Sequence, residues 1–200
     1  PCQDCDAGSI SASAEAYGAL DSANGCQSCG AGTFAAAGAS SCDNCAAGTY
    51  AEPDKSGCID CALGKFSAAA SDLLADCQDC ALGKYSAATP IAESECLDCA
   101  AGKYSVETDA PEASDCIDCA VGKYVDVPGS DAASDCIDCG AGKYIHVTGS
   151  DDILDCIACD AGSYSGAGSG AASDCIDCLP GFADTDSGSD PARPCVECDV

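Results

Sequence analysis

The stretch Cys116-Ile-Asp-Cys119-Ala-Val-Gly122-Lys-Tyr124 decides the fold, because the chain repeats this pattern from end to end. Counted from the first cysteine of each Cys-x-x-Cys pair, a glycine recurs at position +6, and most copies carry an aromatic residue at +8. Eleven such pairs contain all 22 cysteines. The pairs begin at Cys2, Cys26, Cys42, Cys58, Cys77, Cys96, Cys116, Cys136, Cys156, Cys175 and Cys195. Because internal periods of this length are typical of repeat architectures, we expect residues 1–200 to form a single tandem array of about ten repeats.

The composition excludes an ordinary globular core. The chain has only 27 Leu, Ile, Val and Phe residues in 200, no Met and no Trp, and a formal net charge of -27. Such a composition is typical of disorder, but 22 cysteines indicate a disulfide scaffold in an oxidising compartment. We therefore expect small disulfide-rich repeats that form an elongated quasi-solenoid rod of short β-hairpins and loops with little helix. We expect the chain to be extracellular or at the cell surface.

The charge balance also excludes several classes of partner. With 34 acidic residues against seven Lys and Arg, the chain is not expected to bind nucleic acid or anionic lipid headgroups. No apolar run is long enough to span a bilayer, so no membrane insertion is expected in this segment. Pro1-Cys2 and Asp199-Val200 lie within the repeat pattern and no signal peptide precedes them, which indicates a piece of a longer secreted chain.

Each recurring position has a predicted structural role. The glycine at +6 supplies a backbone conformation or a close approach that a Cβ would prevent, and the aromatic residue packs on the adjacent disulfide. The apolar residue between the two cysteines then completes a small core in each repeat. That position holds Ile59, Leu97, Ile117, Ile137, Ile157, Ile176 and Val196. Each repeat is expected to contact only its neighbours.

Charged residues also recur with the period of the repeat, as lysine at +7 and aspartate at +2. The lysines are Lys65, Lys84, Lys103, Lys123 and Lys143. The aspartates are Asp4, Asp60, Asp79, Asp98, Asp118, Asp138 and Asp177. They could form rows of opposite charge, but we favour separately solvated side chains, since exposed ion pairs contribute only about 0 to 1 kcal/mol.

The Gly-Ser pairs and prolines of the loops favour turns, with one helical turn near residues 71–76 and another within residues 6–25.

Three chemistries compete for the Cys-x-x-Cys pairs. A thioredoxin-like motif occurs once in an α/β context, and zinc sites would use the pairs two at a time. The uniform single-pair period favours disulfides in which the second cysteine of each pair joins the first cysteine of the next. The predicted bridges are Cys5–Cys26, Cys29–Cys42, Cys45–Cys58, Cys61–Cys77, Cys80–Cys96, Cys99–Cys116, Cys119–Cys136, Cys139–Cys156, Cys159–Cys175 and Cys178–Cys195. A rival scheme joins first to first and second to second cysteines, and Cys2 and Cys198 would pair outside this segment.

The string Cys-x-x-Cys-x-x-Gly-x-Tyr/Phe, as in residues 116–124 and 136–144, resembles the ephrin-receptor-like cysteine-rich repeat, a relative of EGF-like and TNF-receptor modules. The resemblance covers nearly the whole chain and implies a spacer or a ligand-binding rod in an extracellular protein. The unbroken regularity and acidic loops look more like giant extracellular surface or filament proteins than receptors.

These patterns favour a structural function over catalysis. His146 is the only histidine, and no carboxylate has a distinct apolar setting, so we expect no enzyme activity and no cofactor. We expect the shaft of an extracellular filament or cell-surface appendage, with the chain itself or related chains as partners. The alternative is a ligand-binding or spacer stalk of a receptor-like ectodomain, whose candidate contacts are Tyr17, Leu20 and Arg193.

Two further features leave alternatives open. Asp131, Asp135 and Asp138, or their counterparts Asp151, Asp152 and Asp155, could converge on calcium, but the Asp-x-Asn-x-Asp-Gly signature is absent, so we favour solvated acids and no metal. Serine and threonine in small-residue loops permit O-linked glycans. The sequence has no Asn-x-Ser/Thr sequon, and Asn24-Gly25-Cys26 fits only a rare variant of it.

Overall fold

The computed structural model describes residues 4–11, 25–89, 91–183 and 195–197. Its contacts group the chain into two compact units. The first comprises Pro1–Ala81, Tyr85–Leu97 and Asp109–Glu112, and the second comprises Leu82–Lys84, Asp98–Thr108 and Ala113–Val200. The same repeat builds both units.

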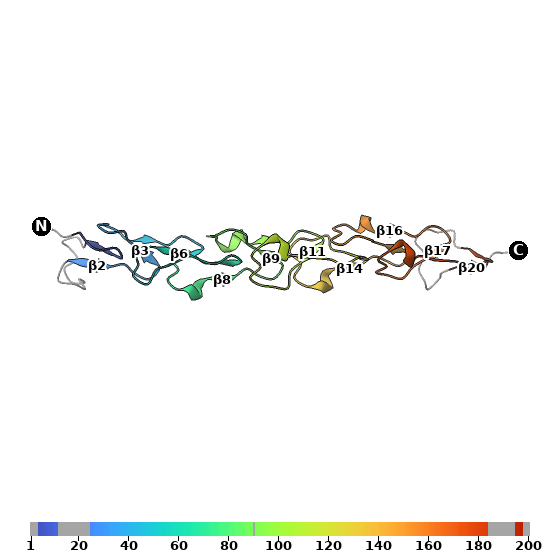
Figure 1. Cartoon of the computed structure of the whole chain (residues 1–200), viewed down its shortest axis with the longest axis horizontal. Coiled ribbons are helices and arrows are strands. Elements are labelled where there is room, and N and C mark those ends of the chain that lie inside the picture. The colour runs from blue at the N-terminus through green and yellow to red at the C-terminus, as the bar shows by residue number, and fades with distance from the viewer. Residues whose placement is uncertain (1–3, 12–24, 90, 184–194, 198–200) are drawn as a thin grey trace. The chain divides into compact units, whose positions relative to one another are not determined.

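Every described strand belongs to a two-stranded sheet whose partners are consecutive in the chain (Figure 1). The hairpins are β1 (Ser9–Ser11) with β2 (Cys26–Ser28), β3 (Thr33–Phe34) with β4 (Asp43–Asn44), β5 (Thr49–Ala51) with β6 (Cys58–Asp60), β7 (Lys65–Phe66) with β8 (Gln78–Asp79), β9 (Lys84–Tyr85) with β10 (Leu97–Asp98), β11 (Lys103–Tyr104) with β12 (Ile117–Asp118), β13 (Lys123–Tyr124) with β14 (Ile137–Asp138), β15 (Lys143–Tyr144) with β16 (Ile157–Ala158), β17 (Ser163–Tyr164) with β18 (Ile176–Asp177), and β19 (Phe182–Ala183) with β20 (Val196–Glu197). The prediction of small disulfide-rich hairpin repeats with little helix is confirmed.

The register of the hairpins follows directly from the repeat. In β11 and β12, Lys103 lies opposite Asp118 and Tyr104 lies opposite Ile117. Positions +7 and +8 of one repeat therefore pair with +2 and +1 of the next, and the loop between them contains the remaining residues of the repeat.

Single 3-10 turns precede six of the first cysteines. They are η1 (Leu74–Asp76), η2 (Glu93–Glu95), η3 (Ala113–Asp115), η4 (Ala133–Asp135), η5 (Ile153–Asp155) and η6 (Ala172–Asp174). The turn predicted near residues 71–76 is confirmed as η1, whereas the other five were not expected from the sequence. In η1, the Asp76 carboxylate accepts hydrogen bonds from the backbone N–H groups of Asp72 and Leu73, both at 3.0 Å. The turn predicted within residues 6–25 falls largely on residues 12–24, which lie outside the described residues.

The small core of each repeat is built on a disulfide. Tyr104 packs against buried Cys119, Val125 and Cys136. One repeat further, Tyr124 clusters with the next disulfide and Ile145 in the same way. The prediction that the aromatic residue packs on a disulfide is confirmed for these two rings. Each ring packs on the disulfide that starts at the second cysteine of the following repeat.

The prediction that the apolar residue between the cysteines completes this core is wrong. Ile117 and Ile137 are 46% and 48% exposed, whereas Cys116 is buried. Both residues of β12 are exposed, and Ile117 lies opposite Tyr104, whose ring is the side chain that packs on the disulfide. The buried residues of these disulfide clusters are instead at +9, namely Val125 and Ile145.

Candidate functional site

The described cysteines form one serial ladder of ten disulfides. The bridges are Cys5–Cys26, Cys29–Cys42, Cys45–Cys58, Cys61–Cys77, Cys80–Cys96, Cys99–Cys116, Cys119–Cys136, Cys139–Cys156, Cys159–Cys175 and Cys178–Cys195. They are the ten pairs that the single-pair period favours, rather than those of the rival scheme. Cys2 and Cys198 lie outside the described residues. Each repeat is thus joined covalently to the next.

Backbone hydrogen bonds reinforce every covalent link between neighbouring repeats. The N–H of Cys119 donates to the carbonyl of Gly102 at 2.8 Å, and the N–H of Gly102 donates to the carbonyl of Val125 at 2.8 Å. The carbonyl of Cys119 in turn accepts from the N–H of Gly149 at 2.9 Å. Because equivalent bonds recur along the chain, the glycines and second cysteines form the hydrogen-bonded centre of each unit.

The repeats also contact their second neighbours, so the expectation of contacts between adjacent repeats only is wrong. Gly102 has φ +83°, and a Cβ built on it would overlap the backbone carbonyl of Gly149. Gly83 meets the carbonyl of Gly129 in the same way, again two repeats further along. The reason is that the loop of each repeat folds back past its neighbour and lies on the glycine of the one before.

The side chain of Asp118 lies against the loop glycine Gly149. Its Oδ1 is 2.9 Å from the position that a Cβ of Gly149 would take, and the same oxygen forms an ion pair with the ammonium group of Lys103. Four cross-strand pairs of this kind connect the +7 lysine to the +2 aspartate. They are Lys65–Asp79, Lys84–Asp98, Lys103–Asp118 and Lys123–Asp138. The interpretation of separately solvated charges is therefore wrong for these residues, although their side chains keep 31–49% exposure.

Two lysines depart from this pairing. Lys143 lies opposite Ala158 in its hairpin, so the register offers it no aspartate. Lys55 lies in a loop with φ +59° and its ammonium donates to the backbone carbonyl of Cys29. The equivalent carbonyl of Cys45 accepts the N–H of Ala70 at 2.8 Å, so a side chain replaces a backbone donor in one repeat.

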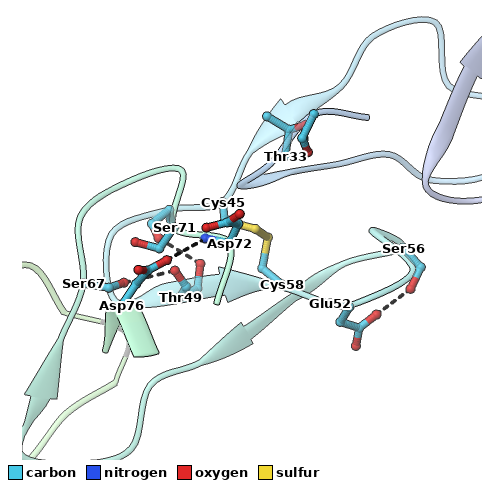
Figure 2. Close-up of a disulfide and its surroundings, with 12 residues drawn as sticks. Thr33, Cys45, Thr49, Glu52, Ser56, Cys58, Ser67, Ser71, Asp72 and Asp76 are labelled. Atoms are coloured by element: carbon cyan, nitrogen blue, oxygen red, sulfur yellow. Dashed lines mark hydrogen bonds between the residues drawn. A yellow bond between two sulfur atoms is a disulfide. The ribbon is translucent and has the colours of Figure 1, made fainter. Parts of the chain in front are cut away.

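Buried hydroxyl groups surround the disulfides, and sequence reasoning missed them. Figure 2 shows Thr49 and Ser67 beside the Cys45–Cys58 disulfide. The hydroxyl of Ser67 donates to the carbonyl of Thr49 at 3.0 Å, and that of Thr49 donates to the carbonyl of Ala46 at 2.8 Å. Buried polar groups need such partners, and the only sequence signal was the serine at +9 of several repeats, such as Ser67 and Ser86.

Local donors lower the pKa of two loop carboxylates. The backbone N–H groups of Leu73 and Asp72 hold the pKa of Asp76 below that of an ordinary aspartate. The hydroxyl and then the N–H of Ser56 lower the pKa of Asp54, and these donors lie 2.7 Å and 3.0 Å from its Oδ1. Both carboxylates thus accept hydrogen bonds from residues of their own turns.

Three of the six aspartates considered for calcium, Asp135, Asp138 and Asp152, have other partners. Asp135 Oδ2 accepts the N–H groups of Asp131 and Ala132 at 3.0 Å, and Asp138 pairs with Lys123. In the second set, the Asp152 side chain accepts the N–H of Leu154 at 2.8 Å. Within the part of the chain that the structure describes, no group of three or more His, Cys, Asp or Glu side chains is arranged to hold a metal ion.

Four other candidate residues, Tyr17, Leu20, Asn24 and Arg193, lie outside the described residues. The ring of His146 lies 6.3 Å from that of Tyr144, measured between centroids.

Ten disulfides are typical of an extracellular or secreted protein. Among the described residues, no helix has the length and apolarity needed to cross a membrane. No protein-family model and no curated protein matches the sequence.

Proposed function

We propose that this chain is a structural protein that forms the shaft of an extracellular filament or cell-surface appendage, without catalytic activity. The observation that carries the proposal is the ladder itself, in which disulfides tie successive repeats together and loops of second neighbours lie against several of the glycines. A mechanical element must transmit load along its length. The disulfides supply a covalent link between successive repeats, and the loop contacts add a steric link at Gly8, Gly32, Gly64, Gly83, Gly102 and Gly122.

The surface of the repeats supports assembly. Aliphatic side chains that are 46–72% exposed, among them Ile117, Ile176 and Val196, project from several of the hairpins. Exposed apolar groups that recur in this way are typical of interaction surfaces. We propose that the chain itself or related chains cover them in the filament, and that O-linked glycans on loop serines and threonines coat the remaining surface.

Negative-stain microscopy of the native protein tests this proposal. Long fibres of constant width, whose length shortens on treatment with a reducing agent, are expected. Dispersed particles under native conditions would instead favour a stalk or spacer and overturn the filament proposal.

A further inference from the structure

Two equivalent grooves lie in successive repeats of the second unit. The Val147 groove is lined by Ile145, Val147, Ser150, Leu154, Asp155 and Ile157 among others. The Val127 groove is lined by the corresponding residues Val125, Val127, Ser130, Ser134, Asp135 and Ile137. Each groove lies between the first residues of the hairpin loop and the 3-10 turn that precedes the next cysteine. The same lining positions therefore recur in both repeats.

The sides of the Val147 groove are aliphatic and open to solvent. Leu154 is 84% exposed, Val147 49% and Ile157 41%. Three large apolar side chains around one groove have little contact with their own chain, and such a concentration marks a surface that is covered by a ligand or partner.

Charge indicates which partner fits. Asp151 and Asp155 line the Val147 groove, and Asp126, Asp131 and Asp135 line the Val127 groove. A second copy of this chain carries the same net charge of -27 and would place like charges against these carboxylates. A cationic partner instead gives complementary potentials, which favour association and specificity.

We propose that each of the two grooves binds a short extended segment of a basic partner protein, with aliphatic side chains in the groove and Lys or Arg side chains beside the carboxylates. Because each groove combines aliphatic side chains with carboxylates, a segment that carries both apolar and basic residues suits it. This inference holds whether or not the chain forms filaments.

Three synthetic peptides test the proposal on the oxidised 200-residue chain, with isothermal titration calorimetry as the readout. One alternates Lys and Leu, one Lys and Ser, and one Glu and Leu. We expect the Lys-Leu peptide to bind at least about tenfold more tightly than the Lys-Ser peptide, since burying a leucine contributes about 1.5 to 3 kcal/mol. Binding should weaken at high salt, and the Glu-Leu peptide should not bind.

Variants separate the groove from general attraction to an acidic surface. Leu154→Ser and Val147→Ser should each weaken binding of the Lys-Leu peptide several-fold. Leu63→Ser is the matched control, because Leu63 is 43% exposed and lines neither groove, and it should leave binding unchanged. Equal binding of the Lys-Leu and Lys-Ser peptides, or an equal loss with Leu63→Ser, would overturn the proposal. So would self-association in sedimentation that Leu154→Ser abolishes, because a second copy would then be the occupant.

Discussion

The backbone carbonyl of Gly149 occupies the space that a side chain on Gly102 would need. These glycines belong to repeats that are not adjacent, and the intervening repeat is joined to both by disulfides, Cys99–Cys116 and Cys119–Cys136. The two disulfides and this close contact thus hold three consecutive repeats together. The smallest segment that unfolds cooperatively in each unit is therefore longer than one repeat.

Gly102→Ala should destabilise the chain by more than the backbone conformation alone explains. A non-glycine residue in the left-handed region costs about 1 to 2 kcal/mol, and the overlap with Gly149 adds to this because a backbone carbonyl cannot move aside as a flexible side chain can. Thermal unfolding of the oxidised protein, followed by circular dichroism, measures the loss.

Gly162→Ala is the control for that prediction. Gly162 has φ +89°, but no atom of the described residues lies within 4 Å of the position of its Cβ. Gly162→Ala should lower the stability only by the cost of a non-glycine residue in the left-handed region. Equal destabilisation by the two alanines would contradict a role for the contact between second neighbours.

Removal of two disulfides of equal loop length should have unequal effects. Cys119–Cys136 and Cys178–Cys195 both have a sequence separation of 17, so the chain-entropy model assigns each about 3 kcal/mol. Cys119 is fully buried against Tyr104 and Val125, whereas Cys178 is only half-buried. Replacing both cysteines of a bridge by serine should therefore cost more at Cys119–Cys136.

Hydrogen exchange measured by mass spectrometry checks this difference. The Cys119→Ser/Cys136→Ser variant should lose protection in β11 to β14, and the Cys178→Ser/Cys195→Ser variant only in β17 to β20. An equal loss of unfolding free energy in the two variants would show that the packing of Tyr104 contributes nothing beyond the cross-link.

The sequence predicts the covalent framework well because that framework depends on local, strictly periodic residues. The cysteine period favours the serial pairing, and Gly102 occupies a position where a conformation or close approach that excludes a Cβ was expected. The burial at +9 could not be read in the same way, since Ser105, Val125 and Ile145 share no polarity. The exposure of Ile117 was missed because apolar character suggests a core, whereas the ring of Tyr104 on the opposite strand packs against the disulfide. Contacts between second neighbours depend on the path of whole loops, which no single position encodes.

The cross-strand ion pairs should contribute little to stability. Lys103 and Asp118 keep 38% and 42% of their side-chain exposure, so Lys103→Met should lower the unfolding free energy by about 0.2 to 1 kcal/mol. Lys143→Met serves as the control, because Lys143 faces Ala158, and it should change stability less. A loss above about 2 kcal/mol for Lys103→Met would show that the contact of Asp118 with the Gly149 loop depends on the ion pair.

The η1 turn should loosen in acid because of Asp76. Its pKa is lowered by the backbone N–H groups of Leu73 and Asp72, so the folded carboxyl binds its proton less readily than the unfolded one. Its contribution to stability is therefore present above the unfolded value of about 3.9 and is lost as the pH falls through the lower folded pKa. Asp76→Asn should destabilise the protein at neutral pH, and this difference from the wild type should shrink as the pH falls below about 4.

Asp60→Asn, which removes an exposed carboxylate of β6, is the matched control. Carboxyl NMR titration of Asp76 gives the direct measurement, and a midpoint at or above that of an ordinary aspartate would mean that the two N–H groups do not stabilise its charge. The Asp76 carboxylate would then be only a hydrogen-bond acceptor whose charge adds no stability, and asparagine should replace it without loss at neutral pH.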